Sequence, residues 1–365
     1  MSGSRATAPR KGRASQHPWS IPRGLIVLLA TAAAVISIAG VKAFAGIVGP
    51  TFLALMLTVA VAPIQAWVRR RGWPAWLGMG LALLAAYAIV LGLLFVLILS
   101  AARLATELPS YSANFDDLMD GIRSMLHGLG VGGDQIQDML SGLSFQQLVT
   151  LLDTALSGLA GVLSNLAFVL ALLLFMAFDA MSMDRRVAIV SRMRPDIAYA
   201  LSSFAAGTRR YLVVSTVFGL IVAVFDGVAL WWLGVPLPLL WALLSFITNF
   251  IPNIGFVIGL VPPALLALLE GGPSLMLWVI LLYCVINFVI QSVIQPKYVG
   301  DAVGLSVTIT FLSLIVWAWV LGALGALLAI PLTLLLKAVL LDIDPSTRWV
   351  SALISTAPQR DSSPE

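Results

Sequence analysis

One acidic side chain stands in the middle of a long apolar segment. Asp226 is flanked by Phe225 and Gly227, and apolar residues dominate for several helical turns on either side. An ionisable group at such a depth in a membrane is costly and is a functional hypothesis by default. Asp226 could carry a proton across part of a functional cycle. The alternative is a protonated, hydrogen-bonded packing residue, and the sequence leaves both interpretations open.

A second group of polar residues interrupts the apolar stretch from Leu237 to Leu269. Asn249, Pro252, Asn253 and Gly255 lie near its middle. The proline removes a backbone donor and frees a carbonyl one turn earlier, while the amides can serve a substrate or a cation. Broken helices near mid-membrane present such groups to ions and polar ligands in transporters. A hairpin of two short helices with the amides as interhelical glue is the other interpretation.

A third group lies on one predicted helix face. Asn287, Gln291 and Gln295 are spaced by four residues and precede Pro296, where we expect the helix to end. A polar stripe on a membrane helix faces protein or water. We therefore predict that a transport path or gate is formed by the following residues: Asp226, Asn249, Pro252, Asn253, Gly255, Asn287, Gln291, Gln295, Pro296, Lys297, Gly300 and Pro331.

Several kinds of chemistry are missing. The sequence has no phosphate-binding loop with its lysine, so ATP hydrolysis of the usual kind is excluded. His17 and His127 lie outside the apolar segments, and Cys284 is the only cysteine. We predict no catalytic residues, no metal site, no cofactor and no enzyme activity. The basic residues are scattered between apolar runs without a recognisable nucleic-acid motif, so we expect no nucleic-acid partner.

The composition requires lipid around most of the chain. Of 365 residues, 60% are hydrophobic and 10% are charged, which leaves too little polar surface for a water-soluble globule. A membrane-crossing helix needs about 20 apolar residues. We predict an all-α polytopic membrane protein with about eight transmembrane helices, one broken or hairpin-like: Leu25 to Val41, Ile47 to Val68, Trp76 to Leu99, Ser157 to Phe178, Tyr211 to Leu233, Leu237 to Leu269, Leu275 to Ile294 and Leu305 to Leu336.

The basic residues fix an orientation. With both termini inside, 17 of the 21 Lys and Arg fall in cytoplasmic segments, and only Lys42, Arg103, Arg123 and Lys297 fall outside. We therefore predict a multi-pass protein of the bacterial inner membrane with cytoplasmic termini. Ala43 to Ala45 resembles a signal-peptide cleavage site, but the apolar region before it is long, and we favour an uncleaved first span.

Two segments lie outside the membrane in this scheme. The acidic stretch 104–156 carries apolar residues at heptad spacing from Leu104 to Met125, which predicts an extracytoplasmic helical hairpin. Its apolar seam could pack on its own returning helix, contact another subunit or gate the substrate. The full division is 1–22 (disordered basic N-terminus), 23–103 (spans one to three), 104–156 (hairpin), 157–180 (span four), 181–208 (cytoplasmic amphipathic segment), 209–341 (spans five to eight) and 342–365 (cytoplasmic tail).

Three motifs carry a family resemblance. They are Ile251-Pro252-Asn253-Ile254-Gly255, Gln295-Pro296-Lys297-Tyr298-Val299-Gly300, and the stretch from Leu321 to Pro331. In order and spacing these motifs resemble the autoinducer-2 exporter (AI-2E) family, which includes PerM-like permeases. The chain departs from the family pattern at Phe256, where relatives commonly have proline, and at Asp226, where a small or apolar residue is expected.

The resemblance implies a transport function. Members are associated with export of the quorum-sensing signal autoinducer-2 and, in other branches, with sodium/proton exchange. We expect a permease or antiporter that moves a small polar solute or cation, coupled to an ion or proton gradient, and by resemblance a homo-oligomer. The alternative is a passive channel or an oligomeric scaffold whose extracytoplasmic hairpin binds a partner. The sequence does not identify the substrate, the coupling ion or the direction of transport.

Overall fold

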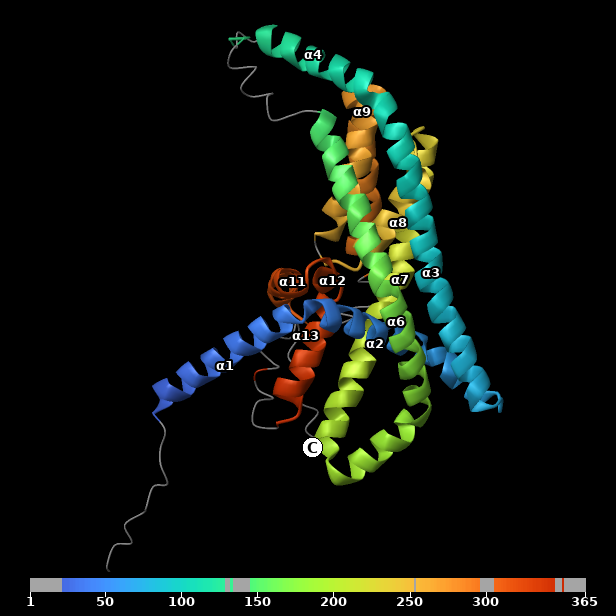
Figure 1. Cartoon of the computed structure of the whole chain (residues 1–365), viewed down its shortest axis with the longest axis vertical. Coiled ribbons are helices and arrows are strands. Elements are labelled where there is room, and N and C mark those ends of the chain that lie inside the picture. The colour runs from blue at the N-terminus through green and yellow to red at the C-terminus, as the bar shows by residue number, and fades with distance from the viewer. Residues whose placement is uncertain are drawn as a thin grey trace, which may run out of the picture. The chain divides into compact units, whose positions relative to one another are not determined.

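The computed structural model describes residues 22–128, 132–133, 145–252, 254–295, 305–344 and 350. Within these ranges every regular element is helical (Figure 1). The chain divides into two units, residues 1–44 and 45–365. The first contains α1 (Arg23–Ala43), and the second contains all the remaining helices.

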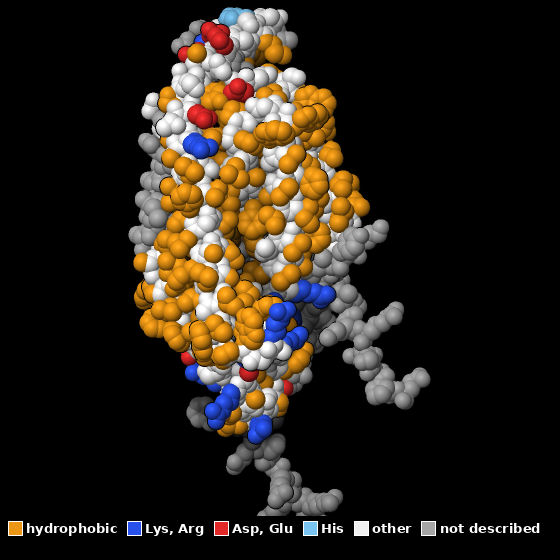
Figure 2. Space-filling view, turned by 90° about the vertical axis from the view of Figure 1, so that its right-hand side faces the viewer, with side chains coloured by type: hydrophobic (Ala, Val, Ile, Leu, Met, Phe, Trp, Pro, Cys, Tyr) orange, Lys and Arg blue, Asp and Glu red, His pale blue; other side chains and the backbone are white. Residues whose placement is uncertain are grey.

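Six helices in the described residues are long and apolar enough to cross a membrane: Gly24–Ala43, Ala45–Arg70, Ala75–Gly128, Leu166–Met193, Pro195–Trp232 and Gly255–Ile294. Two shorter apolar helices accompany them, Pro238–Thr248 and Val307–Leu321. Figure 2 shows hydrophobic side chains covering most of one face, as expected of a surface solvated by lipid tails. The predicted all-α polytopic membrane fold is confirmed.

Three long helices form one packed group: α2 (Ala45–Arg70), α3 (Ala75–Glu107) and α6 (Phe145–Met193). Small residues let their backbones approach, with Ala54, Ala82 and Ala86 buried between them. The hydroxyl of Tyr87 on α3 donates to the carbonyl of Leu170 on α6 at 2.7 Å. A polar anchor inside an apolar interface fixes the register of the two helices.

α6 is longer than any single predicted element. Its 49 residues include the end of the expected returning helix, the fourth span and the start of the cytoplasmic amphipathic segment. The helix ends at Met193, and Pro195 starts α7 (Pro195–Trp232) at a position where a missing backbone donor costs nothing. Arg69 on α2 pairs with Asp184 on α6 at 2.7 Å, but both side chains are exposed, so the pair contributes little stability.

The predicted extracytoplasmic segment begins as a helix. A short 3₁₀ turn, η1 (Leu108–Tyr111), leads into α4 (Ser112–Gly128). Tyr111 is buried in the core cluster that includes α9, and the Asn114 amide donates to the carbonyl of Leu269 at 2.9 Å. The seam residues Leu104, Tyr111 and Phe115 therefore pack in this cluster, whereas Met125 near the end of α4 is exposed. The first part of the predicted returning helix, residues 134–144, lies outside the described residues.

The sixth and seventh predicted spans correspond to a segment broken near Pro252 and a second helical segment that begins after Gly272. α8 (Pro238–Thr248) is followed by a break and then by α9 (Gly255–Asn287). α9 is itself interrupted by the non-helical backbone of Gly271 and Gly272, at the predicted boundary between the two spans. A π-helical turn, η2 (Phe288–Ile294), continues it.

The last predicted span, Leu305 to Leu336, is wrong as a single helix. The segment forms α11 (Val307–Leu321), α12 (Ala323–Leu327) and α13 (Ala329–Lys337), followed by the π-turn η3 (Ala338–Asp342). Gly322 has φ 67°, a left-handed backbone that glycine adopts without strain, and it ends α11. The chain then folds back, so that α13 lies against α11. The Thr333 hydroxyl on α13 contacts the Ser313 hydroxyl and accepts a hydrogen bond from the Trp317 indole, both on α11.

Candidate functional site

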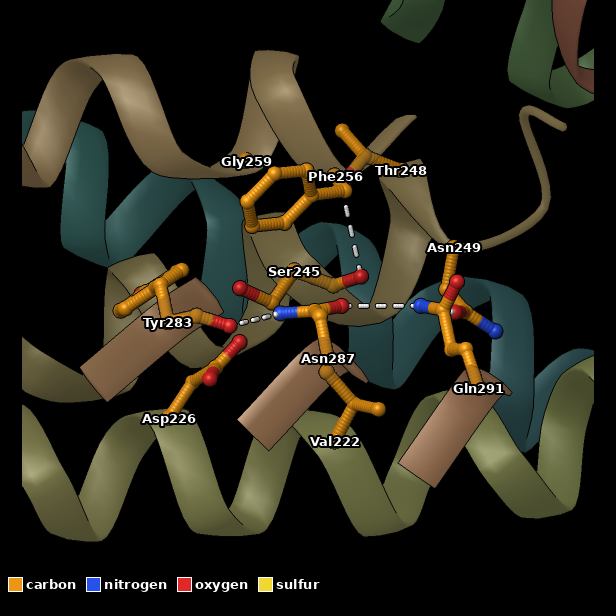
Figure 3. A pocket seen from close by; sticks show the side chains of 10 residues that line it. All are labelled: Val222, Asp226, Ser245, Thr248, Asn249, Phe256, Gly259, Tyr283, Asn287 and Gln291. Atoms are coloured by element: carbon orange, nitrogen blue, oxygen red, sulfur yellow. Dashed lines mark hydrogen bonds between the residues drawn. The ribbon is translucent and has the colours of Figure 1, made fainter. Parts of the chain in front are cut away.

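A small cavity lies between α7, α8 and the α9–η2 segment (Figure 3). Its volume is about 10 Å³, close to the minimum for one water molecule. The polar side chains that line it come from all three elements. The lining residues are Val222, Asp226, Ser245, Thr248, Asn249, Phe256, Gly259, Tyr283, Asn287 and Gln291.

Asp226 is the charged residue of this lining. It has 0% exposure, and neither of its carboxylate oxygens has a hydrogen-bond partner among the described residues. The hydroxyls of Ser245 on α8 and Tyr283 on α9, 5% and 1% exposed, are likewise unpartnered there. Burying such groups without partners is expensive. A carboxyl group beside two hydroxyls can bind a proton, a cation or a water molecule.

A ladder of amides continues from this cluster. Asn287 donates to the carbonyl of Tyr283 at 2.9 Å, and Gln291 donates to the Asn287 side-chain oxygen at 2.8 Å. Gln291 also donates to the side-chain oxygen of Asn249 at 3.0 Å, and Asn249 donates to the carbonyl of Ser215 at 3.1 Å. These bonds join η2, α9, the break after α8 and α7 in one polar network (Figure 3).

The break between α8 and α9 has most of its backbone groups satisfied. The hydroxyl of Tyr211 on α7 donates to the carbonyl of Phe250 at 2.7 Å. Within the break, the Ile251 amide donates to the Thr248 carbonyl at 2.8 Å and the Ile254 amide to the Pro252 carbonyl at 2.7 Å. A non-helical backbone is tolerated at membrane depth only when protein or water satisfies it, and α7 does so here.

Glycines allow the elements around the break to approach closely. A Cβ added to Gly255 would lie 1.8 Å from the Thr248 carbonyl oxygen, so no side chain fits there. A Cβ on Gly219 of α7 would lie 2.8 Å from the Asn249 amide nitrogen. One on Gly259 would lie 2.8 Å from the Thr248 hydroxyl. The close packing around Thr248 and Asn249 thus depends on glycine at positions 219, 255 and 259.

The structure brings together part of the predicted set. Asp226, Asn249, Asn287 and Gln291 all line the cavity, and Pro252 and Gly255 shape the break beside it. The other described residues of the set do not line it. Gln295 follows the π-turn, whose wider winding shifts its face relative to an α-helix, and Pro331 is buried within α13. Asn253, Pro296, Lys297 and Gly300 lie outside the described residues.

Sequence reasoning missed three polar residues of the lining. Tyr283 precedes Asn287 by four positions and extends the predicted polar stripe by one turn, so the spacing contained a usable signal. Ser245 and Thr248 precede Asn249 on the last turn of α8. Hydroxyl side chains are common in membrane helices, where they bond to their own backbone, and this obscures their role. Within the described ranges, no group of three His, Cys, Asp or Glu side chains could hold a metal ion.

Comparison with known proteins adds to this geometry. The profile of the AI-2E family transporters matches residues 25–344. YhhT of Escherichia coli (strain K12), provisionally described as a transport protein, is 29% identical over 88% of this chain and 92% of its own. A protein of Haemophilus influenzae (strain ATCC 51907 / DSM 11121 / KW20 / Rd) with the same provisional description is 32% identical over 90% of this chain and 95% of its own. The AI-2 transport protein TqsA of Escherichia coli (strain K12) is 28% identical over 87% of this chain and 92% of its own.

Proposed function

Because the chain belongs to the AI-2E family of membrane transporters, we propose that it exports or exchanges a small polar solute or cation across the bacterial inner membrane, coupled to an ion or proton gradient. The observation that carries the proposal is the buried cluster of Asp226, Ser245 and Tyr283 beside a broken helix. An acid buried with two hydroxyls at that depth in a membrane protein is costly and is a functional hypothesis by default.

The size of the cavity argues for a closed state. About 10 Å³ admits roughly one water, so a larger solute passes only when α7, α8 and α9 move apart. Two features can absorb such a movement: the break before Gly255, and the non-helical pair Gly271 and Gly272. Separation of these helices would part the Gln291 amide from Asn249 and open the network from Asp226 toward η2.

Coupling follows from the chemistry of a buried acid. A carboxyl group in this cavity needs a proton or a cation to compensate its charge, because no partner among the described residues does so. Release of that proton when one side opens, and its uptake when the other opens, would tie the movement of Asp226 and its neighbours to a gradient. TqsA is named for AI-2, which makes this signal the first solute to test.

Orientation and assembly are part of the proposal. Most Lys and Arg side chains on the face shown in Figure 2 lie toward the end opposite α4. A bias of this kind favours the cytoplasm for the basic end. The proposal of cytoplasmic termini rests on the distribution of Lys and Arg in the sequence. We expect assembly as a homo-oligomer, which cross-linking in native membranes would test.

The experiment is gradient-driven flux in proteoliposomes containing the purified full chain. AI-2, Na⁺ and K⁺ are each offered with and without an imposed pH gradient. We expect flux of one of them that rises with the gradient and falls at least tenfold in Gln291→Leu, which removes the bond to Asn249. Asp117→Asn on the exposed face of α4 is the matched polar control and keeps the wild-type rate.

Two results would contradict the proposal. Flux that is insensitive to the imposed gradient would make the protein a passive channel. Equal flux in wild type, Gln291→Leu and protein-free vesicles would favour a scaffold whose extracytoplasmic segment binds a partner.

A further inference from the structure

A second, larger cavity lies at the start of α8. Its volume is about 430 Å³, within the roughly 300–1,000 Å³ of typical ligand pockets. One wall is α3, which Figure 1 shows alongside α8, and the other is the turn from α7 into α8. The lining residues are Val96, Leu99, Ser100, Arg103, Glu107, Pro236, Leu237, Pro238, Leu239 and Leu240. None of them belongs to the cavity around Asp226.

The α3 wall changes in polarity along its length. Val96, Leu99, Ser100, Arg103 and Glu107 occupy positions i, i+3, i+4, i+7 and i+11, so they share one face of the helix. Arg103 is the first charged residue after Arg71 in the sequence, which places it where the apolar run meets the membrane edge. The pocket is therefore apolar at membrane depth and charged at the level of lipid headgroups.

The opposite wall is preformed. Leu237 has φ 57° and ψ 43°, a left-handed conformation that a residue other than glycine adopts only when the surrounding structure enforces it. Prolines on both sides restrict this turn further. The indole of Trp241, which is buried in the core, donates to the Pro236 carbonyl at 3.0 Å and so stabilises the turn. The wall keeps its shape without help from a ligand.

Two side chains of opposite charge lie at the mouth of the pocket. Arg103 and Glu107 are exposed and one turn apart, and neither forms an ion pair within the described residues. An Arg that precedes an acidic residue on a helix is the less favourable order for such a pair. A guanidinium matches a phosphate, and a carboxylate matches a primary ammonium.

We propose that this pocket binds one phospholipid with a phosphoethanolamine headgroup. The phosphate would be held by Arg103 and the ammonium by Glu107, and one acyl chain would lie between Leu99 on α3 and the turn around Leu237. The exposed side chains of Leu99 and Leu239 leave the apolar part open toward the lipid phase, which gives the chain a path of entry. The site would brace the α7–α8 turn against α3 and does not depend on the proposed transport.

The test is a lipid titration of the purified full chain in detergent, with thermal unfolding as the readout. Dihexanoyl-phosphatidylethanolamine, dihexanoyl-phosphatidylcholine and dihexanoyl-phosphatidylglycerol are compared. We expect saturable stabilisation with the first lipid, at a half-saturating concentration at least tenfold below those of the other two. Phosphatidylcholine cannot donate a hydrogen bond to Glu107, and phosphatidylglycerol has no ammonium.

Variants connect the effect to the pocket. Arg103→Gln removes the proposed phosphate partner, and Leu99→Trp fills the apolar part of the pocket from an exposed position. Each variant should raise the half-saturating lipid concentration at least tenfold. Arg123→Gln on α4 and Leu84→Trp on an exposed part of α3 are the controls and should leave it unchanged. All variants are required to unfold at the wild-type temperature without lipid.

Two outcomes would overturn the proposal. Equal stabilisation by the three lipids, or by phosphatidylethanolamine in wild type and Arg103→Gln, would mean non-specific solvation. A change of particle mass in Leu99→Trp without any change in lipid affinity would mean that a second copy of the chain covers this surface.

Discussion

Replacing Gly219 on α7 with alanine tests how closely the polar network is packed. The added methyl group would lie 2.8 Å from the Asn249 amide nitrogen and 3.2 Å from its Cβ. Contacts this short require Asn249 to move by several tenths of an ångström. Asn249 bonds to both Ser215 and Gln291, at 3.1 and 3.0 Å, so movement weakens both bonds.

The expected magnitude follows from three contributions. Overpacking costs about 1–3 kcal/mol, and each weakened hydrogen bond costs about 0.5–1.5 kcal/mol. Alanine in a helix interior returns about 0.5–1 kcal/mol relative to glycine. We therefore expect Gly219→Ala to destabilise the protein by about 1–5.5 kcal/mol and to lower its transport rate.

The assay compares thermal unfolding and flux for Gly219→Ala and Gly92→Ala. Gly92 lies within α3, and a Cβ there would have no neighbour within 4 Å. The control should be as stable as wild type or more so. Equal stability and equal flux of the two variants would refute the close packing between α7 and Asn249.

Two further substitutions test other contacts. Tyr211→Phe leaves the Phe250 carbonyl without its donor and should cost about 1–3 kcal/mol, measured as a lower unfolding midpoint; an unchanged midpoint would mean that water replaces the hydroxyl. Asn114→Ala removes the hydrogen bond from α4 to the Leu269 carbonyl. Amide hydrogen exchange should become faster in residues 112–128 and stay the same in residues 45–70. Unchanged exchange in both regions would show that this bond does not hold α4 on α9.

Much of the site could be predicted because lipid makes polar residues informative. Asp226, Asn249, Asn287 and Gln291 interrupt apolar runs, and the cost of burying such groups explains why they gather at one cavity. Their grouping was not predictable in detail, since the π-turn after Asn287 sets which amides face Asn249, and periodicity assumes an α-helix.

The C-terminal segment shows where periodicity fails. The residues from Leu305 to Leu336 are apolar enough for one span, and no charge interrupts them. The fold-back depends on the left-handed backbone of Gly322 and on the contact between Ser313 and Thr333. A glycine in a membrane helix is equally compatible with helix packing, so composition could not distinguish the two arrangements.

The pocket beside Arg103 could not be predicted from the positions of the membrane spans. In the sequence Arg103 is one of four basic residues outside the predicted cytoplasmic segments. Its relation to Leu237 and Pro238 exists only because α3 and α8 pack together, at a sequence separation of more than a hundred residues.

In the proposed mechanism Asp226 couples transport to a proton gradient, so proton movement is the measurement to make. Proteoliposomes containing wild type or Asp226→Asn would be loaded with a pH-sensitive dye and given a gradient of the transported solute. We predict proton movement in wild type and its loss in Asp226→Asn, with Asp117→Asn behaving as wild type. Solute-driven proton movement at the same rate in Asp226→Asn would contradict the account.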